Sequence, residues 1–191
     1  HYVKNATALL TLTASLNLSS SKAISALLKW TPSAGRGQVS EIKFKKDNCR
    51  IAIHLIDESY NANPGSMRSA LETLACIFTN KKSKYRHNRR IAVLGDMLEL
   101  GSSEIREHIN ILKFAKLSQI DKISCVGLRM RRLYDVLPSS KQGFWTETAE
   151  EMQHVLVNKF KNGDIVMIKG SFSMRMGTIV SELKRLNNLE F

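Results

Sequence analysis

The chain has 191 residues, of which 43% are hydrophobic and 24% charged, the composition of an ordinary globular protein that can bury a core. This length exceeds the usual single domain of roughly 100 to 150 residues, so we expect one core with an appendage. The sequence contains no stretch near the roughly 20 consecutive apolar residues that a membrane span needs, and it does not begin like a signal peptide. We therefore expect a cytoplasmic protein that makes no membrane contact. We also expect a monomer.

The net charge of +12 is the feature that most favours a nucleic-acid partner, because a basic face neutralises phosphates. Six of the basic residues lie in one run, residues 80–90, and without them 23 basic residues (29 minus 6) oppose 17 acidic ones. Charge runs are most often solvated surface, so we interpret this one as a solvated loop and do not expect nucleic acid as a partner. A basic nucleotide- or nucleic-acid-binding module stays the alternative function.

The cysteines and histidines do not predict a metal site. Cys49, Cys76 and Cys125 are too scattered for a zinc knuckle or a disulfide framework, and Cys76 and Cys125 stand in apolar settings that favour core positions. The histidines lack the paired spacing of metal ligands. We interpret His54 as a strand residue, while His108, on an expected helix, is as compatible with packing as with function.

The first part of the chain predicts two short helices, residues 2–16 and 18–30, from the helical spacing of their apolar residues. Pro32 and two nearby glycines then favour a turn or linker. Because the sequence starts at His1 and enters a helical pattern at once, we expect a piece cut from a longer protein. The boundaries that we expect divide the chain into three segments: residues 1–33, a linker at 34–40, and a second domain at 41–191.

Beyond the linker, apolar strands alternate with amphipathic helices. Residues 41–46 and 50–57 predict a hairpin. This alternation is typical of βαβ units, so we expect an α/β domain with a doubly wound, mainly parallel sheet and helices on both faces. The further expected strands are 90–96, 122–127, 143–146 and 164–170, and the expected helices are 64–77, 103–117, 128–137, 148–160 and 174–186.

In sheets of this kind ligands bind beyond the carboxyl ends of the strands, so the segments that follow the strands carry the candidate site. In the first of these segments, "DESYNAN", Asn63 suits a helix N-cap and Pro64 the first helical position. A helix start does not explain the remaining polar residues of this segment, Asp57, Glu58, Tyr60 and Asn61. Carboxylates there could accept hydrogen bonds from ribose hydroxyls or bind a magnesium-associated water, and the amides could orient a polar substrate.

Two further strand ends are rich in polar or small residues. "VLGDMLELG", with Asp96, standing alone favours a structural strand-turn-helix junction whose glycines relieve crowding. "KGSFSMR" places Lys169 ahead of small residues and Arg175, an arrangement that suits an anionic or carboxylate-bearing ligand. It is not a phosphate loop, because the GxxxxGK[ST] order does not occur in the sequence.

Four segments, "HYVKNATALL…GRGQ", "SYNANPGSMRSAL", "IAVLGDMLELG" and "IKGSFSMRM", together closely resemble the Mur ligases, in the same order along nearly the whole chain. The resemblance implies a Rossmann-like C-terminal domain preceded by a helical remnant of the central ATPase domain. It implies an ATP-dependent amide ligase that uses Mg2+ and adds D-alanyl-D-alanine to UDP-N-acetylmuramoyl-tripeptide in peptidoglycan precursor synthesis. The family's phosphate loop and magnesium ligands would lie upstream of His1, so we expect this piece to be inactive alone, with no catalytic residue of its own.

The resemblance also implies the site residues. Asn5 matches an adenine contact, Arg36 a residue near the phosphates, and Glu58 a residue on the ribose hydroxyls. The implied nucleotide-binding residues are Asn5, Arg36, Glu58, Asn61 and Asn63, and the implied substrate-binding residues are Asp96, Met97, Lys169, Ser171 and Arg175.

Three features depart from the family pattern. Tyr2 stands where asparagine is usual, Phe172 replaces an expected arginine whose charge Arg175 could supply, and the family does not require the basic run at 80–90. A non-catalytic remnant that binds neither nucleotide nor dipeptide therefore stays open as a third interpretation.

Overall fold

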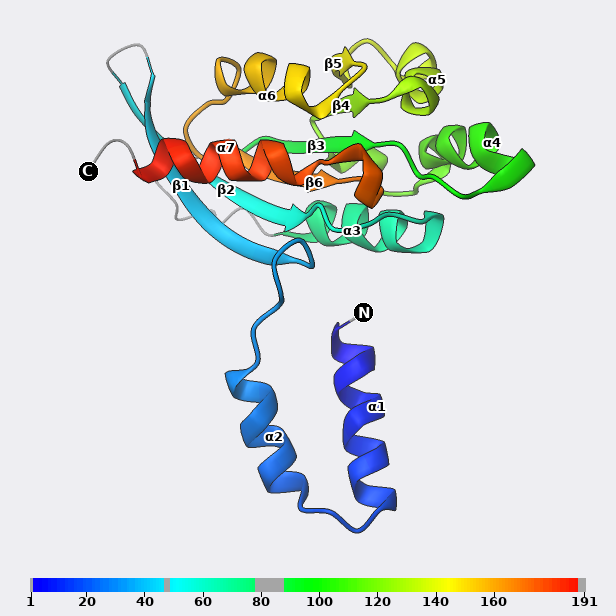
Figure 1. Ribbon diagram of the computed structural model, residues 1–191, viewed down its shortest axis with the longest axis vertical. Coiled ribbons are helices and arrows are strands. Elements are labelled where there is room, and N and C mark those ends of the chain that lie inside the picture. Colours follow the sequence, from blue (N-terminus) through cyan, green and yellow to red (C-terminus); the bar gives the residue numbers. More distant parts are fainter. Residues whose placement is uncertain (1, 47–48, 78–87, 189–191) are drawn as a thin grey trace. The chain divides into compact units, whose positions relative to one another are not determined.

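The computed structural model describes residues 2–46, 49–77 and 88–188, and the chain separates into two compact units, His1–Pro32 and Ser33–Phe191. The first unit is a pair of helices, α1 (Tyr2–Ser15) and α2 (Ser20–Lys29), as the sequence predicts (Figure 1). Ser19 caps α2 by accepting a hydrogen bond from the amide of Lys22, and the rings of Tyr2 and Trp30 lie 5.1 Å apart. Of the residues described in these two helices, none is buried.

The second unit contains a sheet in which six strands run in the order β1-β2-β6-β3-β4-β5. β1 and β2 form an antiparallel hairpin at one edge, and the other neighbouring strands are parallel (Figure 1). The predicted mainly parallel sheet with an N-terminal hairpin is therefore confirmed. The strands are β1 (Gln38–Lys46), β2 (Cys49–Glu58), β3 (Arg90–Gly95), β4 (Lys122–Val126), β5 (Gln142–Thr146) and β6 (Ile165–Lys169).

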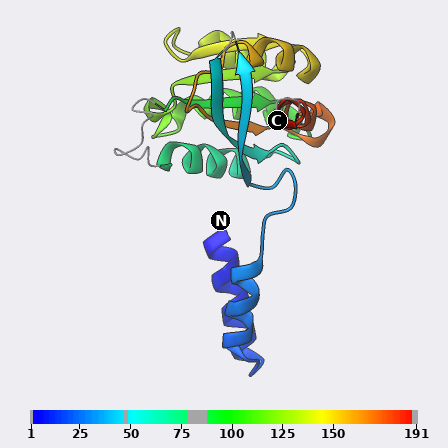
Figure 2. The ribbon, with the colours of Figure 1, turned by 90° about the vertical axis from the view of Figure 1, so that its left-hand side faces the viewer.

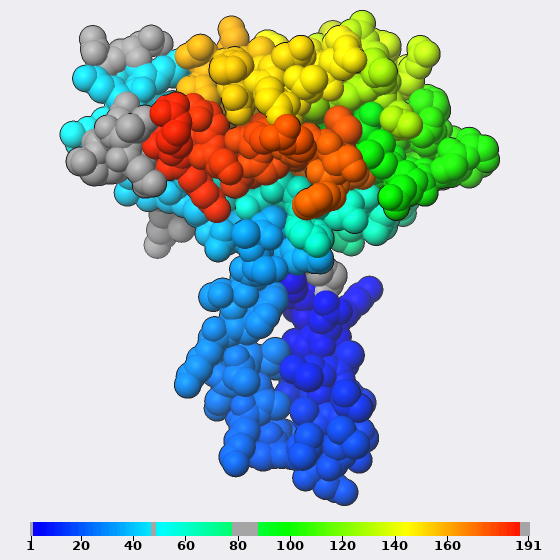
Figure 3. Space-filling model, in the orientation of Figure 1, coloured from blue at the N-terminus to red at the C-terminus, as the bar shows by residue number. Residues whose placement is uncertain are grey.

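Helices cover both faces of this sheet. The helices are α3 (Pro64–Cys76), α4 (Glu104–Ile109), α5 (Leu128–Val136), α6 (Ala149–Val157) and α7 (Gly177–Asn188). α3 and α5 pack on one face, and α6 and α7 pack on the other, each pair closing its own core cluster. α7 is seen end-on in Figure 2, and Figure 3 shows α6 and α7 across the front of the unit.

The two cores follow from the pleat of the central strand β6, in which successive side chains point to opposite faces. Ile165 and Met167 lie in the core under α3 and α5, whereas Val166 and Ile168 lie in the core under α6 and α7. β6 has neighbours on both sides and helices on both faces, so all its residues are buried. This pattern places Lys169, its last residue, at the buried carboxyl end of the sheet.

The helix predicted at 103–117 is wrong in its length. Three short 3-10 turns, η1 (Gly101–Ser103), η2 (Asn110–Lys113) and η3 (Leu117–Gln119), flank the short α4. Ile111, Leu112, Phe114 and Leu117 all pack on the core, and on one straight helix they would spread over more than half of the circumference. The chain therefore leaves the α-helix to bring all four to the sheet.

Three further expectations are also corrected. β1 begins at Gln38, inside the expected linker, because Gln38 pairs in register with Asp57. α7 begins at Gly177, after a 3-10 turn η4 (Phe172–Met174) and Arg175 in the left-handed region at φ 51°. Cys76 is exposed at the end of α3 and is not a core residue, whereas Cys125 is buried as predicted.

Within the ranges that the structure describes, the helices all fall short of the length and apolar character required to cross a bilayer.

Candidate functional site

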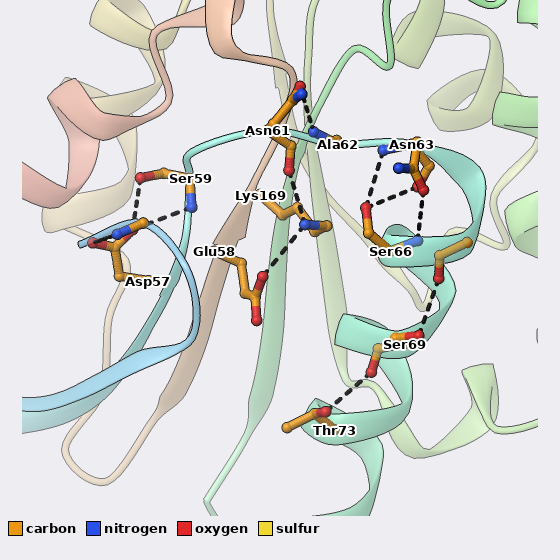
Figure 4. Close-up of polar contacts among 12 residues, drawn as sticks. Asp57, Glu58, Ser59, Asn61, Ala62, Asn63, Ser66, Ser69, Thr73 and Lys169 are labelled. Atoms are coloured by element: carbon orange, nitrogen blue, oxygen red, sulfur yellow. Dashed lines mark hydrogen bonds and ion pairs between the residues drawn. The ribbon is translucent and has the colours of Figure 1, made fainter. Parts of the chain in front are cut away.

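The carboxyl ends of β2 and β6 meet at a buried ion pair. Glu58 and Lys169 are register partners, and the Lys169 Nζ lies 3.4 Å from the Glu58 Oε2 (Figure 4). The same Nζ donates a hydrogen bond of 2.9 Å to the backbone carbonyl of Asn61, while the Lys169 side chain is only 2% exposed. Burial lowers the pKa of Lys169, Glu58 opposes this effect, and the nearby positive charge of Arg36 adds to it.

Asp57, one residue earlier, points to the opposite face, where it holds backbone and lies 4.0 Å from the Lys184 Nζ through its Oδ2. Its Oδ1 accepts hydrogen bonds from the Ser59 hydroxyl and amide, and its Oδ2 accepts from the Gly35 amide (Figure 4). Gly35 has φ 74°, and a Cβ there would lie 2.9 Å from the Tyr60 Cβ. A glycine is therefore required where the segment before β1 crosses the end of β2.

Asn61 and Asn63 make local bonds. The Asn63 side chain accepts from the Ser66 amide, and the Ser66 hydroxyl accepts from the Asn63 amide, a capping box with Pro64 at the start of α3 (Figure 4). The predicted N-cap is confirmed. The Asn61 Oδ1 accepts from the Ala62 amide at 2.8 Å, so both amide side chains are used to shape this loop.

Ser171 links the loops after three strands. Its hydroxyl accepts a hydrogen bond from the Leu98 amide at 2.8 Å and donates to the Ala62 carbonyl at 3.4 Å. Its own amide donates to the Asp96 carbonyl at 3.0 Å. The end of β6 therefore fixes the loops that follow β2 and β3 with respect to each other.

Asp96 caps a helix from a neighbouring strand. Its carboxylate is buried and accepts from the amides of Arg129 at 3.2 Å and Met130 at 2.7 Å, in the first turn of α5. Gly127, at φ 104°, leaves room for it, because a Cβ there would lie 2.5 Å from the Asp96 Cγ. A carboxylate at this position stabilises the positive end of the helix.

His108 is a polar core residue whose role the sequence did not predict. Its Nε2 accepts a hydrogen bond from the Met97 amide at 2.9 Å, so its Nδ1 carries the proton that it donates to the Glu104 carbonyl. Both His108 and Met97 are completely buried. The i to i+4 spacing of Glu104 and His108 on a helix was the available signal, but the partner amide lies on another loop.

An open groove of about 940 Å3 lies beside this edge, on the α7 side. Two aromatic rings, those of Tyr60 and Phe172, line it with their centroids 5.8 Å apart. The Arg36 guanidinium lies over the Tyr60 ring, 4.1 Å from its centroid. Phe172 is 71% exposed, so it adds apolar surface where an arginine was expected. Arg175 also lines the groove, and its guanidinium lies 3.6 Å from the Glu150 carboxylate. The groove thus combines aromatic and basic side chains with the carboxylates of Asp57 and Glu182.

A family model described as Mur ligase, glutamate ligase domain, matches residues 44–172. The chain belongs to the Mur ligase family. The UDP-N-acetylmuramoyl-tripeptide–D-alanyl-D-alanine ligase of Treponema pallidum is 28% identical over 188 residues, which cover 97% of this chain and 37% of that protein. The ligase of the same name from Rickettsia prowazekii is 29% identical over 146 residues, 76% of this chain and 29% of that protein.

Among solved structures, MurF from Acinetobacter baumannii aligns with a TM-score of 0.73 and 27% identity, over 97% of this chain and 37% of that one. The Rossmann-like, mainly parallel sheet is thus shared with a Mur ligase structure. The chain spans about a third of the length of the curated relatives it matches.

The predicted site residues of this Mur ligase domain fall into distinct places. Asn5 belongs to α1 in the first unit, and the other predicted residues belong to the second. Lys169 contacts both Glu58 and the backbone carbonyl of Asn61. Asp96 and Ser171 are joined by a backbone hydrogen bond, while Arg175 stands at the groove.

Most of the basic run at 80–90 lies outside the described residues. Its last two arginines are described, and both hold backbone: Arg89 pairs with Asp164 at 2.6 Å and donates to the Lys159 carbonyl. Arg90 donates to the carbonyl of Ile77, which ends α3. Among the residues described, histidine, cysteine and acidic side chains form no group of three or more placed to hold a metal ion.

Proposed function

We propose that the chain is the carboxyl-terminal portion of an ATP-dependent ligase that joins D-alanyl-D-alanine to UDP-N-acetylmuramoyl-tripeptide in the cytoplasmic synthesis of peptidoglycan precursors. The observation that carries the proposal is the polar carboxyl edge around Glu58 and Lys169, in a chain that aligns over 97% of its length with a ligase of that name. This edge, at the carboxyl ends of the strands, is where α/β sheets bind ligands.

In the proposed reaction ATP phosphorylates the tripeptide carboxylate. The amine of the dipeptide attacks the resulting acyl phosphate, the new amide bond forms, and phosphate leaves. This domain would close over the nucleotide and present the amine, so its contribution is positioning and charge stabilisation. Mg2+ would accompany ATP, and we propose that its ligands lie mostly in the part of the ligase that this chain does not span.

The geometry supports different roles for the proposed nucleotide and substrate residues. Glu58 keeps 15% of its side chain exposed, so it could accept ribose hydroxyls, and Arg36 stands at the groove rim for the phosphates. Arg175, with 72% of its side chain exposed, could meet a carboxylate of the amine substrate. By contrast, Asp96 and Ser171 use their polar atoms to hold backbone, and we propose that they shape the substrate loop without touching the ligand.

A chimera tests this proposal. The portion of Acinetobacter baumannii MurF that aligns with this chain is replaced by these 191 residues, and phosphate release is measured with ATP, UDP-N-acetylmuramoyl-tripeptide and D-alanyl-D-alanine. We expect release that requires all three compounds, and none from the 191 residues alone. A folded chimera that releases phosphate only with a different amine would refute the assigned substrate. Turnover by the 191 residues alone would refute the proposal that this chain needs the rest of the ligase for catalysis.

The matched control is Lys122→Met in the same chimera. Lys122 is a partly buried lysine whose Nζ donates to the Gln142 carbonyl at 3.1 Å, away from the strand ends that carry the site. Its loss should leave phosphate release near the level of the parent chimera, which separates general damage from effects on the site.

A further inference from the structure

We propose that the charged amine of Lys169 is a positioning group, which holds the β2–α3 loop (residues 59–63) in its binding conformation and does not itself touch the substrate. The structure of the loop alone carries the first half of this inference. The second half, that the ordered loop serves ligand binding, rests on the proposed function.

The position of Lys169 explains why its charge must act on the loop. It ends a strand in which every residue is buried, and an ammonium taken out of water is costly unless it is paired and hydrogen-bonded. Its Nζ has the Glu58 carboxylate on one side and the Asn61 carbonyl on the other (Figure 4). The loop carbonyl therefore stabilises the buried ammonium, and the ammonium in turn holds the loop in place.

The loop is anchored independently at both ends. At its start, the Tyr60 amide donates to the Gly35 carbonyl at 3.0 Å, and at its end Asn63 caps α3. Its middle is held from β6, by Lys169 at the Asn61 carbonyl and by the Ser171 hydroxyl at the Ala62 carbonyl. Of these two contacts, the one from Lys169 is shorter and carries a charge, so it should dominate.

Burial argues against direct substrate contact. Lys169 is 2% exposed, and its amine lies beneath the loop that it supports. A ligand at the strand ends would meet the loop first. Lys169 would then affect affinity only through the placement of Glu58 and Asn61, which defines a positioning role.

The charge of Lys169 should make the loop sensitive to alkaline pH. The charged groups that act on its ammonium are Glu58 from β2 and Arg36 from the segment before β1, and burial lowers its pKa below the ordinary value of 10.5. As pH rises through that lowered pKa, the amine becomes neutral and the attraction to Glu58 is lost. Folding favours the neutral amine, so the contribution of Lys169 to global stability rises over the same range. The loop should thus loosen while the domain stays folded.

The test uses the 191-residue chain labelled with [13C]methyl alanine, because Ala62 is buried in the loop and Ala70 is buried in α3. Lys169→Met keeps the length of the stem and removes the charge. We expect the Ala62 methyl signal to move toward the random-coil position in this variant, and the Ala70 signal to stay. Lys122→Met is the control and should move neither. An unchanged Ala62 signal in folded Lys169→Met would overturn the inference.

A pH series keeps the inference testable even where Lys169→Met does not fold. It is run in a Tyr60→Phe background, so that no phenol in the loop can titrate. We expect the Ala62 signal to follow a single titration with a midpoint below 10.5, which a purely steric role for Lys169 would not produce. An Ala62 signal that is constant up to global unfolding would contradict the proposal.

The functional half is measured in the chimera described above. Lys169→Met should raise the KM for ATP or for the dipeptide by about tenfold, the effect of losing one charge-assisted hydrogen bond, while changing kcat less. A KM equal to that of the parent chimera would refute the link to binding. An inactive parent chimera would instead count against the proposed function, and the methyl signals would still decide the role of Lys169.

Discussion

Replacing Asp96 by alanine should destabilise the second unit by removing the cap of α5. The carboxylate accepts hydrogen bonds from the Arg129 and Met130 amides, and Met130 is completely buried. Once Asp96 is shortened, the Met130 amide has lost its acceptor in a place that water reaches poorly. The Arg129 amide lies nearer the surface and can be hydrated.

The size of the effect follows from these contacts. A buried amide without a partner costs about 1–3 kcal/mol, and the loss of a negative charge at a helix N-terminus adds about 0.3–1 kcal/mol. The ion pair of 3.6 Å to the Arg129 side chain adds little, because that side chain is partly exposed. We therefore expect Asp96→Ala to lower the free energy of unfolding by about 2–3 kcal/mol, and Asp96→Asn, which keeps one acceptor oxygen, by about 1 kcal/mol.

Urea unfolding followed by circular dichroism measures these differences. The control is Asp135→Ala on the same helix, which removes an exposed pair with Arg131 and should cost less than about 0.5 kcal/mol. The reasoning is refuted if Asp96→Ala matches Asp135→Ala in stability. If it also abolished the activity of the chimera at unchanged stability, Asp96 would act on the substrate and not on the helix.

Three further perturbations probe other parts of the same unit. His108→Phe should lower the free energy of unfolding in urea by about 1–3 kcal/mol, because the Met97 amide, which donates a hydrogen bond to the His108 ring, is left unpaired in the core. Burial raises the pKa of Cys125, so a thiol reagent such as dithionitrobenzoate should leave that residue unmodified in the folded chain while it modifies the chain's other two cysteines, which are exposed. Gly35→Ala should destabilise more than Gly101→Ala in the same unfolding assay. Both glycines have positive φ, but a Cβ at Gly35 would meet Tyr60 at 2.9 Å whereas nothing lies within 4 Å at Gly101; equal losses would refute the steric reason.

The elements that the sequence predicted well are those fixed by neighbouring residues. Asn63 and Pro64 begin α3 through a capping box that spans four residues, and the strands show their burial as apolar runs. The helix predicted at residues 103–117 was wrong because the conformation of this segment depends on the sheet against which it packs. A helical pattern was visible there, yet the core required side chains from too much of the helix surface.

In the candidate site, too, local features could be predicted and long-range contacts could not. That polar residues cluster at the strand ends was predictable from the parallel topology, but their partners were not. Asp96 caps a helix that begins more than thirty residues later, and Lys169 reaches a loop more than a hundred residues earlier. Such pairs depend on strand order, and the insertion of β6 between β2 and β3 leaves no local mark in the sequence.

The contacts of Arg89 and Arg90 change how the basic character of the chain should be interpreted. Both lie where parallel strands begin, which is also where the covering helices end and where their carbonyls carry partial negative charge. Arg90 meets the carbonyl after α3, and Lys46 similarly donates to the Phe160 carbonyl beyond α6. Part of the positive charge is thus internal counter-charge for helix ends. Lys46, Arg89 and Arg90 thus add to the net charge of +12 while making contacts inside the domain, and they should be left out when that charge is taken as a sign of a polyanion-binding surface.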